Sequence, residues 1–146
     1  MTEILIKRLS KDVPLPKYET DGSSGLDLAA NINENIEIKP GKSEIIPTGL
    51  AVAIPKQFEI QIRPRSGLAA KNQISVLNTP GTIDADYRGE LKVILINLSN
   101  KSFIVEKGLR IAQMVLCPVM RATLKEVEAL DDTERGSGGF GSTGAK

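Results

Sequence analysis

The stretch GTIDADYRGE, residues 81–90, contains two carboxylates that could do acid–base or electrostatic chemistry. Asp84 and Asp86 are two positions apart, so an extended backbone would present both on one face. Tyr87 and Arg88 follow directly and add an aromatic ring and a cationic donor. A surface hairpin with merely solvated carboxylates would contain the same residues, and the stretch alone does not separate the two interpretations.

The sequence contains no histidine. Its absence excludes triads and dyads with a histidine base and zinc sites with histidine ligands. The single cysteine, Cys117, lies in the apolar stretch MVLC, which predicts a small buried residue rather than a nucleophile. Any catalysis must therefore rest on carboxylates, on a metal with oxygen ligands, or on main-chain and arginine electrostatics.

The stretch RGSGGFGSTG, residues 135–144, is too rich in glycine to form a helix, a strand or a core. It contains the spacing G-x-G-x-x-G at Gly136, Gly138 and Gly141, but a dinucleotide-binding fold needs a helix after this motif, and only five residues follow. Glycines also let backbone N–H groups approach phosphate oxygens, and Arg135, Ser142 and Thr143 add donors. The alternative is a frayed tail, but in a solvated tail neither Arg135 nor Phe140 would make a stabilising contact.

The stretch PRSGLAA, residues 64–70, places an arginine, a serine and a glycine at the start of a short predicted helix. Ser66, two positions after a proline, is predicted as the N-cap. Free N–H groups at a helix N-terminus bind anions, so this stretch could hold a phosphate. Ordinary helix capping explains the same residues and is, by itself, the simpler interpretation.

Two weaker patterns put isolated polar side chains in apolar surroundings. In SSGLDLAA, residues 23–30, Asp27 lies between two leucines, as a buried carboxylate or as the partner of a cation. In GLRIAQ, residues 108–113, Arg110 and Gln113 enter an otherwise apolar strand, which is commonly structural. Together the five stretches suit a polyphosphate that bears a flat ring, with at least one carboxylate acting through hydrated Mg²⁺ or through water.

Short strand-like segments separated by glycine, proline and asparagine must position these residues. In FEIQIR, residues 58–63, apolar and polar residues alternate with the period of a half-buried strand. A nearly continuous apolar run at residues 91–97 predicts a central strand covered on both faces. NTPGT, residues 78–82, predicts a type II turn that joins residues 74–77 and 82–85 as a hairpin. The predicted strands are residues 4–9, 26–30, 36–39, 43–54, 58–63, 74–77, 91–97, 103–107 and 110–119.

The pattern predicts an all-β chain with one short helix at residues 66–71, built as a sandwich, jelly roll or small barrel. We expect one domain over residues 1–130, followed by a flexible glycine-rich arm over residues 131–146. A net charge of +1 and scattered basic residues predict binding neither to nucleic acid nor to membranes. The apolar runs are too short for a signal peptide or a membrane span, which predicts a soluble, cytoplasmic protein.

Taken in order, SGLDLAA, PRSGLA, GTIDADYRGE, GLRIAQ and RGSGGFGSTG closely resemble the five motifs of the homotrimeric dUTPases, the dUTP diphosphatases. The resemblance spans essentially the whole chain. It implies a jelly-roll subunit in a threefold homotrimer, in which three chains assemble each active site and one lends its C-terminal arm. The arm would then be a lid that orders over the nucleotide, with Phe140 stacked on the uracil, at a cost of about 1 to 2 kcal/mol per ordered residue.

The resemblance also implies roles for single residues. Asp84 matches the catalytic carboxylate that orients the attacking water, and an ionised carboxylate can do so without any histidine. Tyr87 matches the tyrosine under the deoxyribose, where a 2′-hydroxyl would clash. Asp27 matches a carboxylate that holds Mg²⁺ through water, and Arg110 fits a structural partner near it. The matched substrate contacts are Arg65, Ser66, Gly67 and Gln113 for the phosphates, Asn78, Gly81, Thr82, Ile83 and Lys92 for the base, and Arg135, Phe140, Gly141, Ser142 and Thr143 in the arm.

The implied reaction is Mg²⁺-assisted attack of water on the α-phosphorus of dUTP, which releases dUMP and pyrophosphate. It would keep uracil out of DNA and supply dUMP for thymidylate synthesis. Two alternatives stay open: a trimer of the dCTP deaminase type, and a nucleotide-binding β-module without catalysis. The DYRG stretch and Phe140 favour dUTPase over the first, and Asp84 argues against the second. Asn72 stands where many dUTPases carry histidine, which puts only a peripheral role in doubt.

Overall fold

Ten β-strands and one short α-helix make up the structure, a computed structural model that describes residues 1–146. In chain order the elements are β1 (Leu5–Arg8), β2 (Leu26–Ala29), β3 (Ile36–Ile38), β4 (Ser43–Ala53), β5 (Phe58–Arg63), α1 (Ser66–Asn72), β6 (Ile74–Val76), β7 (Gly81–Ile83), β8 (Glu90–Asn97), β9 (Phe103–Val105) and β10 (Arg110–Pro118). Every predicted strand is present. No helix has the length and apolar character that a membrane span requires.

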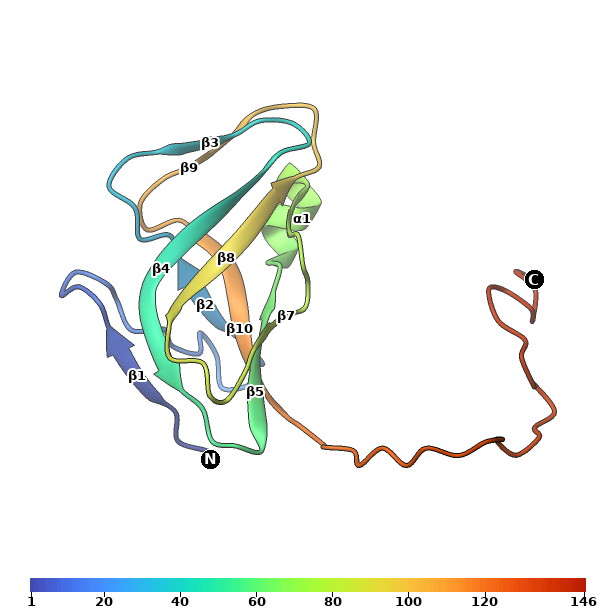
Figure 1. Ribbon diagram of the computed structural model, residues 1–146. Helices are drawn as coiled ribbons and strands as arrows, with labels where there is room; N and C mark the ends of the chain where they lie inside the picture. Colours follow the sequence, from blue (N-terminus) through green and yellow to red (C-terminus); the bar gives the residue numbers. More distant parts are fainter.

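The strands form two four-stranded sheets and a small two-stranded one (Figure 1). The first sheet has the order β1-β4-β8-β6, and the second has the order β2-β10-β5-β7. β3 and β9 pair at one end of the domain. Every pairing is antiparallel, and strands that are neighbours in a sheet are mostly distant in the chain. This is the all-β jelly roll that the sequence predicts.

The hydrophobic core of 20 buried residues lies between the two larger sheets. In β5 and β8 alternate residues point inward, because successive side chains of a strand leave opposite faces. In β8, Leu91, Val93 and Leu95 are buried, whereas Lys92 is exposed. β8 is therefore central in its sheet, as predicted. The expectation that both of its faces are covered is wrong within one chain, where Ile94 on the outer face is only partly buried.

The outer face of the first sheet is apolar. Ile45 of β4 is 59% exposed and lies opposite Ile94 of β8. Leu77, directly after β6, is 51% exposed, and its N–H donates to the carbonyl of Ile94. Leu98, directly after β8, is 63% exposed. Exposed aliphatic side chains on neighbouring strands form a surface suited to contact with another protein chain.

The start of α1 differs from its prediction. The N-cap is Arg65 and not Ser66, which is the first residue of the helix. The carbonyl of Arg65 accepts the N–H of Ala69 at 3.0 Å, so the helical hydrogen bonds start one residue earlier than the sequence suggests. Arg65 has an extended backbone and makes no side-chain capping bond. Its side chain is directed to the site described below.

The predicted hairpin around NTPGT is absent. β6 pairs with β8 in the first sheet, whereas β7 pairs with β5 in the second. Gly81 lacks the positive φ angle that the third position of a type II turn requires. The chain therefore crosses from one sheet to the other at this point, which places β7 at an edge.

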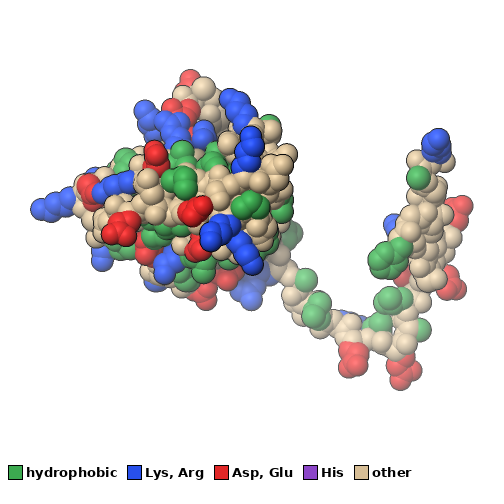
Figure 2. Space-filling model, turned by 90° about the horizontal axis from the view of Figure 1, so that it is seen from above, with side chains coloured by type: hydrophobic (Ala, Val, Ile, Leu, Met, Phe, Trp, Pro, Cys, Tyr) green, Lys and Arg blue, Asp and Glu red, His purple; other side chains and the backbone are tan.

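Beyond β10 the chain leaves the domain as an extended arm (Figure 1). Residues 118–137 are exposed throughout. Met120, Leu124 and Leu130 are 95%, 93% and 84% exposed, and Figure 2 shows hydrophobic side chains free along the arm. Within one chain these aliphatic side chains have no surface to cover.

Candidate active site

The predicted site residues occupy three separate places in the chain. One group lies on β2, on β10 and on the segment that joins β5 to α1. A second group surrounds β7 and the loop to β8. The third group lies in the arm, which stands away from both (Figure 1).

Asp27 of β2 is the centre of the first group. Its Oδ1 accepts a hydrogen bond from Nε of Arg65 at 3.1 Å, and its Oδ2 accepts one from Nη1 of Arg110 at 3.2 Å. Arg110 also forms an ion pair with Glu19 at 3.4 Å. The side chain of Asp27 is 22% exposed, so the carboxylate is reachable from solvent. The structure thus makes Arg110 a partner of Asp27, as the sequence suggested.

Strand register brings Gln113 into the same group. β10 lies between β2 and β5, so Gln113 is opposite Asp27 on one side and Arg63 on the other. Its Nε2 donates to the carbonyl of Pro64 at 2.9 Å and fixes the segment that leads into α1. Gly25 leaves the necessary room, because an added Cβ would collide with Oε1 of Gln113 and lie 3.2 Å from its Cβ. Strand pairing, not proximity in sequence, assembles this group.

Ser66 and Gly67 form the exposed first turn of α1, directly after Arg65. No atom lies within 4 Å of the place that a Cβ on Gly67 would take, so the helix start is open. Nη1 of Arg65 also donates to the carbonyl of Arg110 at 3.4 Å. The guanidinium groups of Arg65 and Arg110 therefore flank the carboxylate of Asp27. The hydroxyl of Ser66 and the main-chain amide of Gly67 are exposed next to them. The excess of donors and of positive charge suits anionic oxygens.

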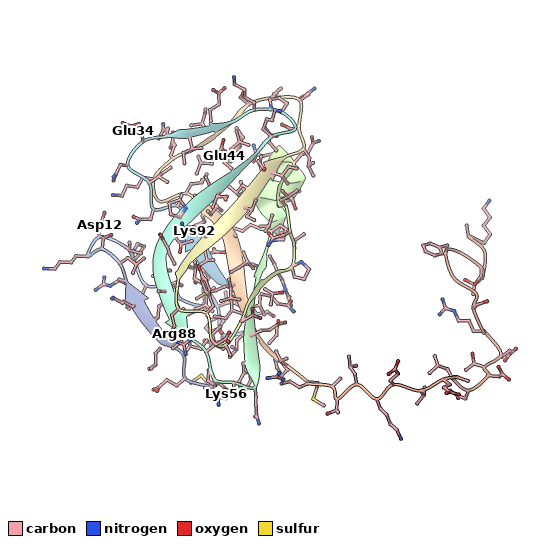
Figure 3. The ribbon with its side chains drawn as sticks, in the orientation of Figure 1. Asp12, Glu34, Glu44, Lys56, Arg88 and Lys92 are labelled. Carbon is pink, nitrogen blue, oxygen red and sulfur yellow. The ribbon has the colours of Figure 1, made fainter.

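Asp84 follows β7 directly and opens onto a surface pocket bordered by β7, the loop after it and the start of β8. The residues that line this pocket are Thr82, Ile83, Asp84, Tyr87, Glu90 and Lys92. The predicted catalytic carboxylate, the predicted sugar-packing tyrosine and three of the predicted base contacts therefore share one pocket. Asp84 also borders a second hollow with Asp86, Arg88 and Lys56, at the end of the domain from which the arm leaves (Figure 3).

The ring of Tyr87 is held from one side. It lies against Gly89, where an added Cβ would collide with Oη and lie 2.6 Å from Cζ. Oη donates to the carbonyl of Glu90 at 2.9 Å, and the N–H of Tyr87 donates to the carbonyl of Asp84 at 3.1 Å. Tyr87 is still 43% exposed. The contacts leave an aromatic surface open beside Asp84.

β7 contributes a free main-chain edge. It is the last strand of its sheet and pairs only with β5, so the N–H and C=O groups along its other side are available to a ligand. Asn78 adds an amide here, since a Cβ on Gly81 would lie 3.3 Å from Nδ2 of Asn78 and 3.3 Å from Cβ of Ile62. Gly81 therefore permits the close approach of Asn78. Main-chain groups and an amide together suit a planar base with both donors and acceptors.

The arm residues lie apart from both groups. Phe140 is fully exposed and has a positive φ of 49°, and Gly141 follows with 85°. Nε of Arg135 donates to the carbonyl of Gly138 at 2.8 Å, which is a bond within the arm. Ser142 and Thr143 are exposed. One chain therefore does not bring residues 135–143 of the arm to the Asp27 group or to the Asp84 pocket.

Two residues that shape the pocket, Glu90 and Gly89, were not predicted from the sequence. Glu90 lies in the stretch GTIDADYRGE but received no role, although its Oε1 accepts the N–H of Gly49 at 2.9 Å. These residues are 41 positions apart, so no local pattern relates them. Gly89 matters only because of where the Tyr87 ring lies. The one available signal was the pair Thr48–Gly49 inside a long strand pattern, since glycine in a strand often marks a bulge.

The carboxylates do not form a metal cage. No group of three or more histidine, cysteine, aspartate or glutamate side chains is placed to hold a metal ion. Each oxygen of Asp27 accepts a bond from an arginine, but a carboxylate has about four lone-pair sites and can also accept from metal-bound waters. This donor set fits a hydrated Mg²⁺ carried by phosphates better than a metal held by protein ligands alone.

Asp12 lies near the first group and has a shifted pKa. The hydrogen bond from Nζ of Lys107, at 2.7 Å, and a second from Ser10 lower the pKa of Asp12 to about 2. Both side chains of the Asp12–Lys107 pair are about half exposed, at 56% and 52%. The pair joins the loop after β1 to the loop that leads into β10.

Comparisons with known proteins identify the family of the chain. A family model described as dUTPase matches residues 11–144. The chain is 59% identical over 145 residues to the deoxyuridine 5'-triphosphate nucleotidohydrolase of Rickettsia bellii (strain OSU 85-389), with 99% of this chain and 97% of that protein covered. It is 54% identical over 145 residues to the protein of the same name from Fusobacterium nucleatum, with 99% of each covered.

Among solved structures, the G164S mutant of the Staphylococcus bacteriophage 80alpha dUTPase with dUpNHpp superposes with a TM-score of 0.88 at 28% identity. That match covers 99% of this chain and 100% of the phage chain. Likeness over the whole length, in sequence and in fold alike, shows that this chain belongs to the dUTPase family and is an enzyme that hydrolyses dUTP.

Proposed function

We propose that this chain hydrolyses dUTP to dUMP and pyrophosphate by Mg²⁺-assisted attack of water on the α-phosphorus. The observation that carries the proposal is the pocket in which Asp84 lies beside the open surface of Tyr87 and the free edge of β7. The phage 80alpha enzyme with dUpNHpp supports a nucleotide as the ligand. The reaction would keep uracil out of DNA and supply dUMP for thymidylate synthesis.

The base and sugar would occupy this pocket. The free edge of β7, with main-chain groups of Thr82 and Ile83, would pair with the uracil edge, and Asn78 would add its amide. Lys92 borders the same pocket. Tyr87 would pack under the deoxyribose, where a 2′-hydroxyl would clash. Selection by buried polar pairing can exceed selection by one methyl group, which would help to exclude the other bases.

Asp84 would orient the attacking water. An ionised carboxylate accepts a hydrogen bond from water and can take its proton as the water oxygen bonds to the α-phosphorus. The bond from the α-phosphorus to the bridging oxygen then breaks, and pyrophosphate leaves with the electron pair. The absence of histidine from the chain agrees with a carboxylate in this role.

The group around Asp27 would bind the phosphates. Arg65, Ser66, Gly67 and Gln113 offer the guanidinium, hydroxyl, main-chain and amide donors that phosphoryl oxygens require. Asp27 would hold Mg²⁺ through its waters, and the bound metal would neutralise phosphate charge. Neither pocket that includes Asp84 includes any of these residues. Within one chain, the residues proposed to bind the phosphates therefore lie apart from the pocket proposed for the base.

A homotrimer would bring the parts together. The outer face of the first sheet, with Ile45 and Ile94, continues along β8 to Lys92 at the rim of the Asp84 pocket. A neighbouring copy on this apolar face would therefore stand next to the pocket. A threefold ring closes such a head-to-tail contact without leaving a free surface.

The arm would close the site of a neighbouring chain. Its aliphatic side chains have no partner in their own chain, and its end carries the glycines, Arg135 and Phe140. Phe140 would stack on the uracil, while Arg135, Gly141, Ser142 and Thr143 would contact the distal phosphates. The glycines allow both this close approach and reopening after the reaction.

The test is pyrophosphate release from dUTP, dTTP, UTP and dCTP by the purified protein with Mg²⁺. We expect turnover of dUTP and little of the other three. Turnover of dCTP with release of ammonia would instead favour the dCTP deaminase type. Binding of dUTP without any turnover would contradict the proposal and favour a non-catalytic nucleotide-binding module.

A further inference from the structure

We propose that Glu90 is a positioning residue for sugar selection, because its carboxylate closes a gap between β4 and β8 while its carbonyl holds the ring of Tyr87. The inference rests on the proposed function, in which Tyr87 packs under the deoxyribose. It goes further by naming the residue that keeps Tyr87 in place.

The gap is a bulge in β4. The pairing of β4 with β8 shifts register between Pro47 and Ala51. Gly49 lies inside the shifted segment, is buried and has a φ of 71°. A bulge leaves a main-chain group without a ladder partner. Here Oε1 of Glu90 accepts the N–H of Gly49 at 2.9 Å and takes the place of the missing carbonyl.

The bulge is fixed on its other sides as well. Oγ1 of Thr48 donates to the carbonyl of Leu91 at 2.6 Å, and the carbonyl of Gly49 accepts the N–H of Leu9 at 2.8 Å. A Cβ on Gly49 would lie 2.6 Å from Nδ2 of Asn31 and 2.6 Å from Cγ2 of Val13. Close packing therefore holds Gly49 in place. The carboxylate of Glu90 ties the start of β8 to this fixed residue.

Glu90 connects this anchor to the pocket. Its side chain accepts a hydrogen bond from the N–H of Gly49, and its carbonyl accepts one from Oη of Tyr87 at 2.9 Å. The ring of Tyr87 lies against Gly89, which directly precedes Glu90. Without the carboxylate, the start of β8 keeps its pairing with Ala51 and the bond from Thr48 but loses its link to the bulge at Gly49, so the carbonyl that holds the ring is fixed less firmly. Asp84 follows β7, which is held by its pairing with β5, so the carboxylate that acts on water is affected less.

Charge is the competing explanation, because Glu90 and Lys92 border the same pocket. Two conservative substitutions separate charge from hydrogen bonding. Glu90→Gln removes the charge but keeps an oxygen at the same distance along the side chain. Glu90→Asp keeps the charge but is one methylene shorter, so its oxygens cannot reach Gly49 from the same backbone position.

The experiment measures kcat and KM for dUTP and for UTP, with the melting temperature of each variant. We expect Glu90→Asp to lower the ratio of kcat/KM for dUTP to that for UTP by about tenfold, which corresponds to about 1.4 kcal/mol of lost discrimination. The change should lie mainly in KM. Glu90→Gln should keep the wild-type ratio, and Tyr87→Phe, which breaks the same link from the other side, should lower it.

Glu44→Ala is the matched control, because this glutamate of β4 is exposed and makes no side-chain hydrogen bond. It lies far from Arg88, which is two residues before Glu90 and marks the pocket end of the first sheet in Figure 3. Glu44→Ala should leave the ratio unchanged. An unchanged ratio in Glu90→Asp, or a loss in Glu90→Gln as large as in Glu90→Asp, would overturn the inference.

Tyr87→Ala separates this inference from the proposed function. If that variant still prefers dUTP over UTP as strongly as the wild type, then Tyr87 does not select the sugar and the proposed role of the pocket fails. If Tyr87→Ala loses the preference but Glu90→Asp keeps it, only the inference about Glu90 fails.

Discussion

At the scale of single residues, the chain contains no histidine, and the proposed site is built from carboxylates and arginines. Asp27 is bonded to two arginines, whereas Asp84 forms no ion pair with an arginine or lysine. The two carboxylates therefore differ in environment: Asp27 is paired with arginines, and Asp84 is free to contact water. This difference supports the proposed catalytic role of Asp84.

Replacement of Asp84 by asparagine should abolish most of the turnover. Asparagine keeps the size of the side chain but cannot take a proton, so we expect kcat to fall by about 10² to 10⁴-fold while KM changes little. Steady-state kinetics with dUTP and Mg²⁺ measure both. A variant with wild-type kcat would exclude Asp84 as the base.

Asp12 should make stability depend on pH in the acid range. A carboxyl whose pKa is lowered by folding stabilises the folded state above its unfolded pKa, and this contribution is lost as the pH falls through the folded pKa. For Asp12 the window lies between the ordinary value of 3.8 and about 2. The melting temperature of Asp12→Asn should therefore be slightly below that of the wild type at pH 7, and the difference should disappear near pH 2. A difference that grows on acidification would contradict the assigned ion pair with Lys107.

Site residues could be predicted from the sequence where a local motif contains them. They could not be predicted where their role depends on a contact between distant parts of the chain. Asp27, Arg110 and Gln113 stood out as polar residues in apolar strands, and strand pairing places them together. Glu90 did not stand out, because its partner Gly49 is 41 positions away and the contact depends on a bulge. Cys117 was expected to be buried and is only half-buried, near the end of β10.

At the scale of elements, alternation of apolar and polar residues was enough to locate the strands but not to pair them. Residues 74–77 and 82–85 were predicted as one hairpin because a proline and a glycine separate them. The structure instead places β6 and β7 in different sheets. A local turn signal says that the chain changes direction, whereas burial of both faces against distant strands decides where each segment pairs.

The arm is the element whose removal is most informative. Because β10 ends at Pro118, a chain that stops after Asp132 keeps every strand and the core. We expect this truncated chain to melt within about 2 °C of the wild type, since exposed segments contribute little to stability, and to lose most of its dUTP turnover. Calorimetry and pyrophosphate release measure the two properties. A large loss of thermal stability would show instead that the arm is part of the fold.

At the scale of the whole molecule, one chain presents three incomplete parts of a site. The group around Asp27, which we propose binds the phosphates, the Asp84 pocket proposed for the base and sugar, and the end of the arm do not meet (Figure 1). The same chain exposes an apolar sheet face and several aliphatic side chains on the arm, which are costly to leave in water. The proposed homotrimer would explain both observations, because copies of the chain would cover these surfaces and complete each other's sites.

Complementation between two inactive chains tests this account most directly. The Asp84→Asn chain has an intact arm, and the chain truncated after Asp132 has an intact Asp84. Each is refolded alone, and the two are also refolded together in equal amounts before dUTP turnover is measured.

We predict that each chain alone is nearly inactive and that the mixture regains about a quarter of the wild-type rate, because random assembly combines an intact Asp84 with an intact arm from another chain at about one site in four. A mixture as inactive as its components would contradict the account, since it would mean that Asp84 and the arm must come from the same chain.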